Sequence, residues 1–144
     1  MLGVAAFQIA LIDELNDPLI GACWDTGHGN LPKFMNAGKD PSPESDSIDQ
    51  YQNLVRLGKR LKALHVHDNN CFEDDHLIPY HGKICWDRVI AALDEIEYEQ
   101  FFTFEAHNAS ARMCQGNMSR ETVDTANRLL YEIGVDLVSK SKLK

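Results

Sequence analysis

The chain has 144 residues, of which 44% are hydrophobic and 25% charged, which suits one domain with a buried core. Its formal net charge of -8 argues against a surface for nucleic acid or anionic membranes, because neutralising phosphates requires clustered lysine and arginine. No apolar run approaches the roughly 18 residues of a membrane span, and the apolar start lacks the basic segment of a signal peptide. Four widely spaced cysteines without a C-x-x-C pair fit reduced thiols in a cytoplasmic protein.

The first part of the chain predicts a helix, a strand and a long loop. Apolar residues at helical spacing predict a helix over residues 7–15, which ends at the Asn16-Asp17-Pro18 turn. The continuous apolar run 19–24 predicts a strand that is covered on both faces. Residues 30–46 contain three prolines and predict a long loop, a kind of segment that is often functional.

The rest of the chain continues this alternation. The pattern predicts a helix over 47–57 capped by Ser47, a strand over 61–66, a helix over 86–96, a strand over 101–104 and a last helix capped by Ser119. Strands that alternate with helices at this spacing indicate parallel βαβ units. The lysine-rich end predicts a disordered basic tail over 136–144.

Metal-type ligands follow each of the three predicted strands. The segments are Asp25-Thr26-Gly27-His28, His65-Val66-His67-Asp68 and Glu105-Ala106-His107. Carboxylates and imidazoles are costly to bury unless they are paired or bound to a cation. Their position at strand ends therefore predicts one shared polar site, as at the catalytic mouth of a (βα)8 barrel. Because a complete barrel needs roughly 250 residues, we expect an α/β fold that is a partial TIM barrel, with about three parallel strands and flanking helices.

Each motif also has a simpler interpretation. Asp25 followed by His28 is the pattern of a helix cap with a surface histidine. His65 and His67 point to the same face of a strand, as metal ligands or as hydrogen-bonded core groups, and Glu105 can be a buried acid paired with an arginine. Their order on three successive strand ends favours a common site, in which His65 orients a ligand.

The same residues resemble a known family. The motifs are Asp25-Thr26-Gly27-His28, His65-Val66-His67-Asp68-Asn69, Asp75-His76-Leu77-Ile78-Pro79 with Gly82 and Trp86, and Phe104-Glu105. In this order they resemble the C-terminal half of the sugar phosphate isomerase/epimerase superfamily, a group of xylose isomerase-like TIM barrels that also includes endonuclease IV. The resemblance covers most of the chain and implies that residues 1–144 form a single portion with about the last three strands of such a barrel.

The resemblance implies a role for each site residue. Asp25, His67 and Glu105 correspond to metal ligands, and Glu105 also corresponds to one of two catalytic glutamates that exchange protons with the sugar. His28 corresponds to a histidine that contacts the substrate in the sugar epimerases, or the metal in endonuclease IV. The family's other acidic ligand, a glutamate on an earlier strand, is expected upstream of Met1.

The loop that follows the second strand is open to two interpretations. Asp74 and His76 match an Asp-x-His pair that binds a second metal in endonuclease IV, whereas in sugar isomerase-like members this loop closes around the substrate. We favour the second interpretation, with His76 and His81 as substrate contacts, because an abasic-site endonuclease needs a basic surface. Glu73 stands where ketohexose 3-epimerases carry an arginine, so we do not predict that activity.

The sequence therefore predicts a divalent-metal-dependent isomerase or epimerase of a sugar or sugar phosphate. Carboxylate oxygens with one imidazole suit Mn²⁺, Mg²⁺ or Co²⁺, with Zn²⁺ as an alternative; the ion would stabilise an enediolate. Two alternatives remain: a non-catalytic half-barrel that binds metal or sugar, and an endonuclease IV-like nuclease. We expect a small sugar as substrate, no nucleic acid and no membrane partner, and either a homo-oligomer or pairing with the missing half-barrel, because three parallel strands leave open edges.

Overall fold

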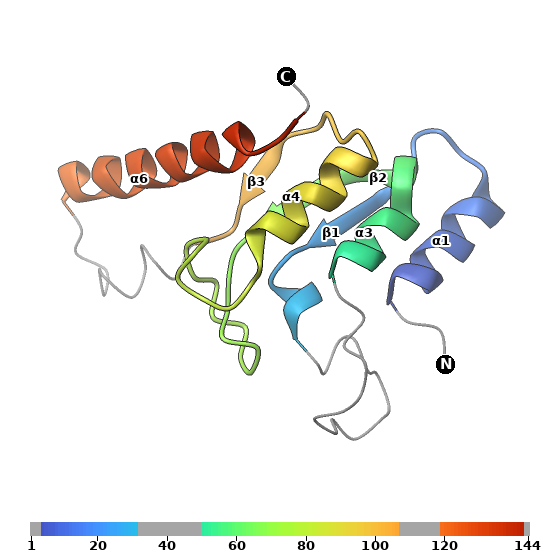
Figure 1. The fold of residues 1–144 in the computed structure, drawn as a ribbon, viewed down its shortest axis with the longest axis horizontal. Coiled ribbons are helices and arrows are strands. Elements are labelled where there is room, and N and C mark those ends of the chain that lie inside the picture. The colour runs from blue at the N-terminus through green and yellow to red at the C-terminus, as the bar shows by residue number, and fades with distance from the viewer. Residues whose placement is uncertain (1–3, 32–49, 107–118, 143–144) are drawn as a thin grey trace.

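A computed structural model describes residues 4–31, 50–106 and 119–142 and shows a small parallel sheet with flanking helices (Figure 1). Helices α3 and α4 lie across the sheet, while α1 and α6 lie at its opposite ends (Figure 1). In chain order the elements are α1 (Val4–Leu15), β1 (Ala22–Asp25), the 3-10 turn η1 (His28–Asn30), α3 (Gln50–Leu57), the 3-10 turn η2 (Gly58–Arg60), β2 (Leu61–Val66), α4 (Trp86–Glu95), β3 (Phe102–Phe104) and α6 (Arg120–Ser139).

The sheet has the order β1-β2-β3, and both neighbouring pairs are parallel. Asp25 pairs in register with His65, and Val66 pairs with Phe104. The predicted α/β fold with three parallel strands is thereby confirmed. Because parallel strands end at the same edge, the segments that follow β1, β2 and β3 meet there.

The two faces of the sheet differ in chemistry. Trp24, Leu64 and Val66 are buried in the core that the sheet forms with α3 and α4. Cys23, next to Trp24 in the strand, is exposed, as the two-residue period of a strand requires. In the described part of the chain, the face of β1 that bears Cys23 is therefore open at this residue, whereas the Asp25 side chain at the end of the strand is only 13% exposed.

The first strand is shorter than the sequence predicts. It begins at Ala22, whereas Leu19 is 94% exposed. The reason is local, because Asp17 holds the preceding residues in a turn: the Leu19 amide donates to Asp17 Oδ1 and the Ile20 amide to the Asp17 carbonyl. Such Asx-type turns compete with strand formation.

The last helix is longer than predicted. Its predicted cap is confirmed, since the Ser119 side chain accepts a hydrogen bond from the Thr122 amide. The helix then continues to Ser139, so residues 136–139 are helical and do not belong to a disordered tail. Burial of Leu137 explains this extension, and beyond the helix Lys140 donates to the Tyr80 hydroxyl at 3.1 Å.

Some predicted features lie outside the described residues: Ser47, residues 32–46 of the long loop, His107, Cys114 and the last two residues of the tail. Cys23, Cys71 and Cys85 are free thiols. Among the helices in the described ranges, none has the length and apolar character of a membrane span.

Asp68 organises the loop that follows β2. Its buried carboxylate accepts hydrogen bonds from the amides of Asn69, Tyr80 and Ile84 and from Trp86 Nε1, all within 3.1 Å. Gly82 packs directly against this carboxylate, since an added Cβ would lie 2.2 Å from Asp68 Oδ1. Asp68 is thus a structural residue, and it fixes the path of the loop that carries Asp74 and His76.

We predict that Asp68→Ala lowers the free energy of unfolding by about 3 kcal/mol or more, because it leaves several buried donors without an acceptor. Urea unfolding followed by circular dichroism measures the change. Asp87→Ala is the matched control, since the Asp87 side chain is 82% exposed, and its effect should stay within about 0.5 kcal/mol. Equal stability of the two variants would contradict the role assigned to Asp68.

Candidate metal centre

Acidic and imidazole side chains from three strands converge at the carboxyl-terminal edge of the sheet. Asp25 is the last residue of β1, His67 directly follows β2, and Glu105 directly follows β3. Each offers one potential ligand atom, and these atoms all lie within 4.8 Å of one another. Asp25 Oδ1 lies 2.9 Å from His67 Nε2. The structure therefore brings together the three residues that the sequence analysis names as ligands, although their binding role remains a prediction.

His65 also lies near the two carboxylates and is closer to Glu105 than to Asp25. Its Nδ1 lies 2.9 Å from Glu105 Oε1 and 3.8 Å from Asp25 Oδ2. Ligands about 2.1 Å from one ion lie about 3 to 3.5 Å apart, so the separation from Glu105 suits a shared cation, whereas the separation from Asp25 is longer than this range. The His65 side chain is 37% exposed, whereas that of His67 is fully buried. From the sequence we expect His65 to orient a ligand, and the two-residue period alone does not tell the two histidines apart.

His67 is held in a tight pocket. The Thr26 hydroxyl donates to the His67 carbonyl and accepts from its amide, at 2.7 and 3.1 Å. Gly27 lies against the imidazole, and a Cβ there would come within 1.9 Å of Cε1. The ring stacks on that of His76, with centroids 4.0 Å apart and planes 5° from parallel. The position of His67 therefore depends on the residues that follow both β1 and β2.

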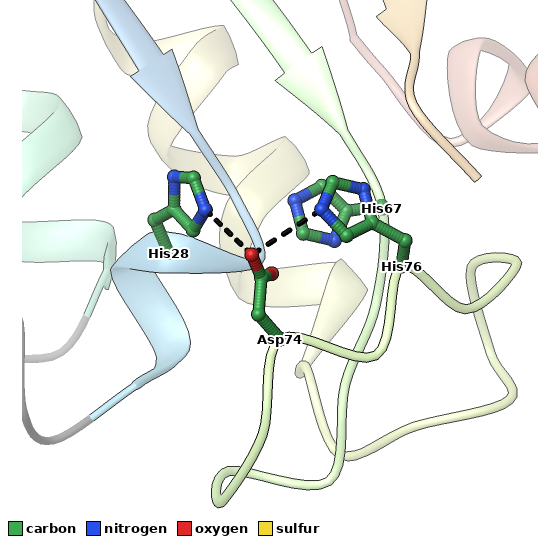
Figure 2. Close-up of side chains that lie close together, drawn as sticks. All are labelled: His28, His67, Asp74 and His76. Atoms are coloured by element: carbon green, nitrogen blue, oxygen red, sulfur yellow. Dashed lines mark hydrogen bonds and ion pairs between the residues drawn. The ribbon is translucent and has the colours of Figure 1, made fainter. Parts of the chain in front are cut away.

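A second cluster adjoins the first and shares His67 with it. It contains His28, His67, Asp74 and His76, which Figure 2 shows around the Asp74 carboxylate. Asp74 Oδ2 lies 3.0 Å from His28 Nε2 and 3.3 Å from His76 Nε2. His76 Nδ1 is also 2.8 Å from the Glu105 carbonyl, which ties this loop to the end of β3. Three imidazoles and a carboxylate form a donor set that suits Zn²⁺.

The electrostatic balance of the site favours positive charge. Burial by itself raises the pKa of Asp25, but its contacts with His67 and His28 outweigh this effect and leave the pKa below its usual value. Burial likewise lowers the pKa of His67, yet Asp25, Asp74 and Glu105 bring it above the usual value. The pKa of Asp74 is lowered, because His28 and His76 outweigh its desolvation. The lowered pKa values of Asp25 and Asp74 favour their ionised forms, whose negative charge in turn favours a bound cation or a proton on His67.

Buried polar atoms in the described residues also fit a metal ion. Both ring nitrogens of His67 and Oδ1 of Asp74 are buried and have no hydrogen bond of acceptable geometry. Nearly all buried polar groups in proteins have such a partner, and a cation coordinated by these atoms would supply one. The residues present therefore fit a divalent metal.

The other predicted site residues are placed differently. His81 is exposed and belongs to neither cluster, so the structure does not bring it to the metal-type ligands. Trp86 is buried, and Tyr80 donates to Asp136 Oδ2 at 2.7 Å. These contacts fit the packing role that aromatic residues commonly have.

The fold and the site are together those of a portion of a (βα)8 barrel, in which polar ligands lie at the carboxyl ends of the strands. The residue pattern of the family described as xylose isomerase-like TIM barrel matches residues 5–133. The chain therefore belongs to this family.

Two curated relatives are similar to the chain. The protein named Uncharacterized protein y4fM, from Sinorhizobium fredii, is 33% identical over 95 residues, which are 66% of this chain and 26% of the relative. Uncharacterized protein MJ1311, from Methanocaldococcus jannaschii, is 24% identical over 124 residues, which are 86% of this chain and 38% of the relative. The matched part of the chain thus spans about a quarter to two fifths of the length of these relatives.

We predict that His67 in the metal-free protein titrates above the usual histidine pKa of about 6.5. Asp25→Asn should lower this pKa, because it removes the nearest negative charge. NMR titration of the imidazole C–H signals in EDTA-treated protein measures both values. A His67 pKa at or below the usual value that does not respond to Asp25→Asn would contradict the proposed pairing.

Proposed function

We propose that this chain carries the divalent-metal centre of an isomerase or epimerase that acts on a sugar or sugar phosphate. The observation that supports the proposal most is the convergence of Asp25, His67 and Glu105 from the ends of three neighbouring strands. These are the positions that the resemblance assigns to metal ligands. The relatives are uncharacterized, so the activity rests on the site and the family.

The donor set determines which metals suit the site. Two carboxylates with one imidazole favour Mn²⁺, Mg²⁺ or Co²⁺, and the imidazole also allows Zn²⁺. When bound, such an ion supplies Lewis-acid charge that stabilises an enediolate formed from the sugar. Asp25, Glu105 and a histidine of the β2 end would hold it.

Glu105 is the residue that we assign as the base. Its side chain is 33% exposed, so a substrate can reach it. Its amide donates to the Val66 carbonyl at 3.0 Å, which continues the β2–β3 ladder and fixes the backbone below the carboxylate. Its carboxylate would take the proton from the hydroxyl-bearing carbon next to the sugar carbonyl and return it to the carbonyl carbon; with transfer of the hydroxyl proton to the former carbonyl oxygen, this completes an isomerisation.

Epimerisation requires more than Glu105. The proton must return to the opposite face of the same carbon, and for this a second acid is needed on that face. We assign no second carboxylate among the described residues to that role, because Asp25 is assigned to the metal. We therefore assign to this chain the metal centre and one of two acid–base groups, and full turnover is assigned to a more complete barrel. A half-barrel that binds metal or sugar without turnover is the alternative.

The second cluster favours another candidate function, hydrolysis of a phosphoester. His28, Asp74 and His76 lie beside the first ligand group and share His67 with it, and paired metal sites are common in phosphoester hydrolysis. An abasic-site endonuclease is the member of this class that the resemblance suggests. The net charge of -8 counts against a DNA substrate, so we rank this function second.

We predict that the protein binds Mn²⁺ and that Asp25→Asn and Glu105→Gln each weaken binding by more than about 100-fold, because loss of even an outer partner commonly costs 10–100-fold. Isothermal titration calorimetry measures the affinity. His65→Gln and His67→Gln in parallel identify which histidine is the ligand. Glu97→Gln is the acidic control, since Glu97 is exposed and pairs with Lys59. Unchanged Mn²⁺ affinity in all four site variants would contradict the proposed metal centre.

We also predict slow exchange of sugar C–H hydrogen with deuterium from the solvent by the Mn²⁺-loaded protein. Exchange needs only one base, and Glu105→Gln at saturating Mn²⁺ should reduce it by about 100-fold or more. NMR on a panel of aldoses and ketoses detects the exchange. Metal binding without exchange on any sugar would support the non-catalytic alternative, and cleavage of abasic DNA instead would support the hydrolase.

A further inference from the structure

The side chain of Asn69 is fully buried between the segments that follow β1 and β2. Its Nδ2 donates to the Gly27 carbonyl at 2.7 Å, and its Oδ1 accepts from Asn30 Nδ2 at 2.9 Å and from the Cys71 amide at 3.0 Å. Gly27 and Asn30 belong to the segment after β1, whereas Cys71 belongs to the loop after β2. One carboxamide therefore joins the two segments.

Asn30 strengthens this connection from the side of β1. Its Nδ2 also donates to the Cys71 thiol at 3.3 Å. Its amide donates to the Gly27 carbonyl at 3.0 Å, so this carbonyl accepts from both asparagines and the 3-10 turn η1 is attached to Asn69. We call Asn30 and Asn69 the asparagine lock.

Asn69 also contacts the far end of the loop after β2. Its carbonyl accepts from the Lys83 amide at 2.8 Å. Gly82 packs against its backbone, since an added Cβ would lie 2.4 Å from the Asn69 carbonyl oxygen. The carboxylate of Asp68 holds the same loop from within, whereas the carboxamide of Asn69 ties the loop to η1.

The two segments that the asparagine lock joins supply the second cluster. His28 is the first residue of η1, and Asp74 and His76 lie in the loop after β2. In Figure 2, His28 lies on one side of the Asp74 carboxylate and His76 on the other. His76 has a φ of 48°, which residues other than glycine rarely adopt. Such a backbone persists only where the surrounding contacts fix it, and the asparagine lock supplies contacts of this kind.

We propose that Asn69 is a positioning residue, which together with Asn30 locks η1 to the loop after β2. The lock holds His28 against Asp74 and His76 and so sets the geometry of the second cluster. A buried carboxamide with partners on both sides allows few arrangements, because a shift of either segment leaves a donor or an acceptor unpaired. The proposal deepens the proposed metal centre and rests on it only for metal binding, since the lock itself is a property of the metal-free chain.

Alkylation of Cys71 tests the asparagine lock in EDTA-treated protein. Cys71 is partly buried and Cys85 is exposed, so iodoacetamide followed by peptide mass mapping compares two rates within one molecule. Asn69→Ala should raise the rate at Cys71 relative to Cys85 by about tenfold or more, because it removes hydrogen bonds on both sides. Asn30→Ala should act in the same direction. Asn70→Ala is the matched control, since Asn70 is the next residue and is exposed, and here the ratio should stay within about twofold.

Metal titration tests the consequence for the second cluster. Glu105→Gln alters the first cluster and leaves the second complete, so calorimetry with Zn²⁺ in this background reports on the second cluster. Adding Asn69→Ala should weaken Zn²⁺ binding by about tenfold or more, whereas adding Asn70→Ala should leave it unchanged. With Glu105 intact, Asn69→Ala should change the Mn²⁺ affinity by less than about twofold, because the first cluster lies at the strand ends. Asn30→Ala serves for both measurements if Asn69→Ala does not fold.

Three results would overturn the proposal. The first is an unchanged rate at Cys71 in both Asn69→Ala and Asn30→Ala. The second is an equal loss of Mn²⁺ and Zn²⁺ affinity, which would indicate a general structural role, and the third is no Zn²⁺ binding in the Glu105→Gln background. Failure of the proposed function would look different, because the unaltered chain would then not bind Mn²⁺ while the rate at Cys71 still responded to Asn69→Ala.

Discussion

The structure depends on the parallel register that joins β1 to β2 and β2 to β3. Because the three strands run in one direction, the residues after each strand reach the same edge, and there Asp25, His67 and Glu105 meet. The chain places these polar groups where they contact one another instead of the apolar core, which avoids the cost of burying them alone. The contact of 2.9 Å between Asp25 and His67 links the first two strand ends.

The surroundings of this edge show how a rigid scaffold supports the candidate site. Asp68 anchors the loop that follows β2 through four hydrogen bonds from amides and an indole, and this loop carries Asp74 and His76 back toward the sheet. Gly27 leaves room for the imidazole of His67. A buried carboxylate with a purely structural role thus lies one residue from a candidate ligand, and only its donors distinguish the two roles.

Much of the fold follows from the sequence, because apolar runs and capping residues act locally. The strand over 61–66 and the Ser119 cap are where the pattern predicts them. The errors occur where a local or distant contact overrides the pattern: Asp17 holds Leu19 in a turn, and burial of Leu137 extends the last helix. The candidate ligands were identifiable from their position after strands. The proximity of His65 to both carboxylates could not be predicted from the sequence, because it depends on side-chain orientation across strands.

One measurement tests the central claim most directly: the anomalous difference density of Mn²⁺ in crystals of the protein. The account predicts an ion within about 2.3 Å of a carboxylate oxygen of Asp25 and one of Glu105, with a nitrogen of His65 or His67 as a further ligand. An ion bound elsewhere, or well-ordered carboxylates at this edge without density between them at saturating Mn²⁺, would contradict it.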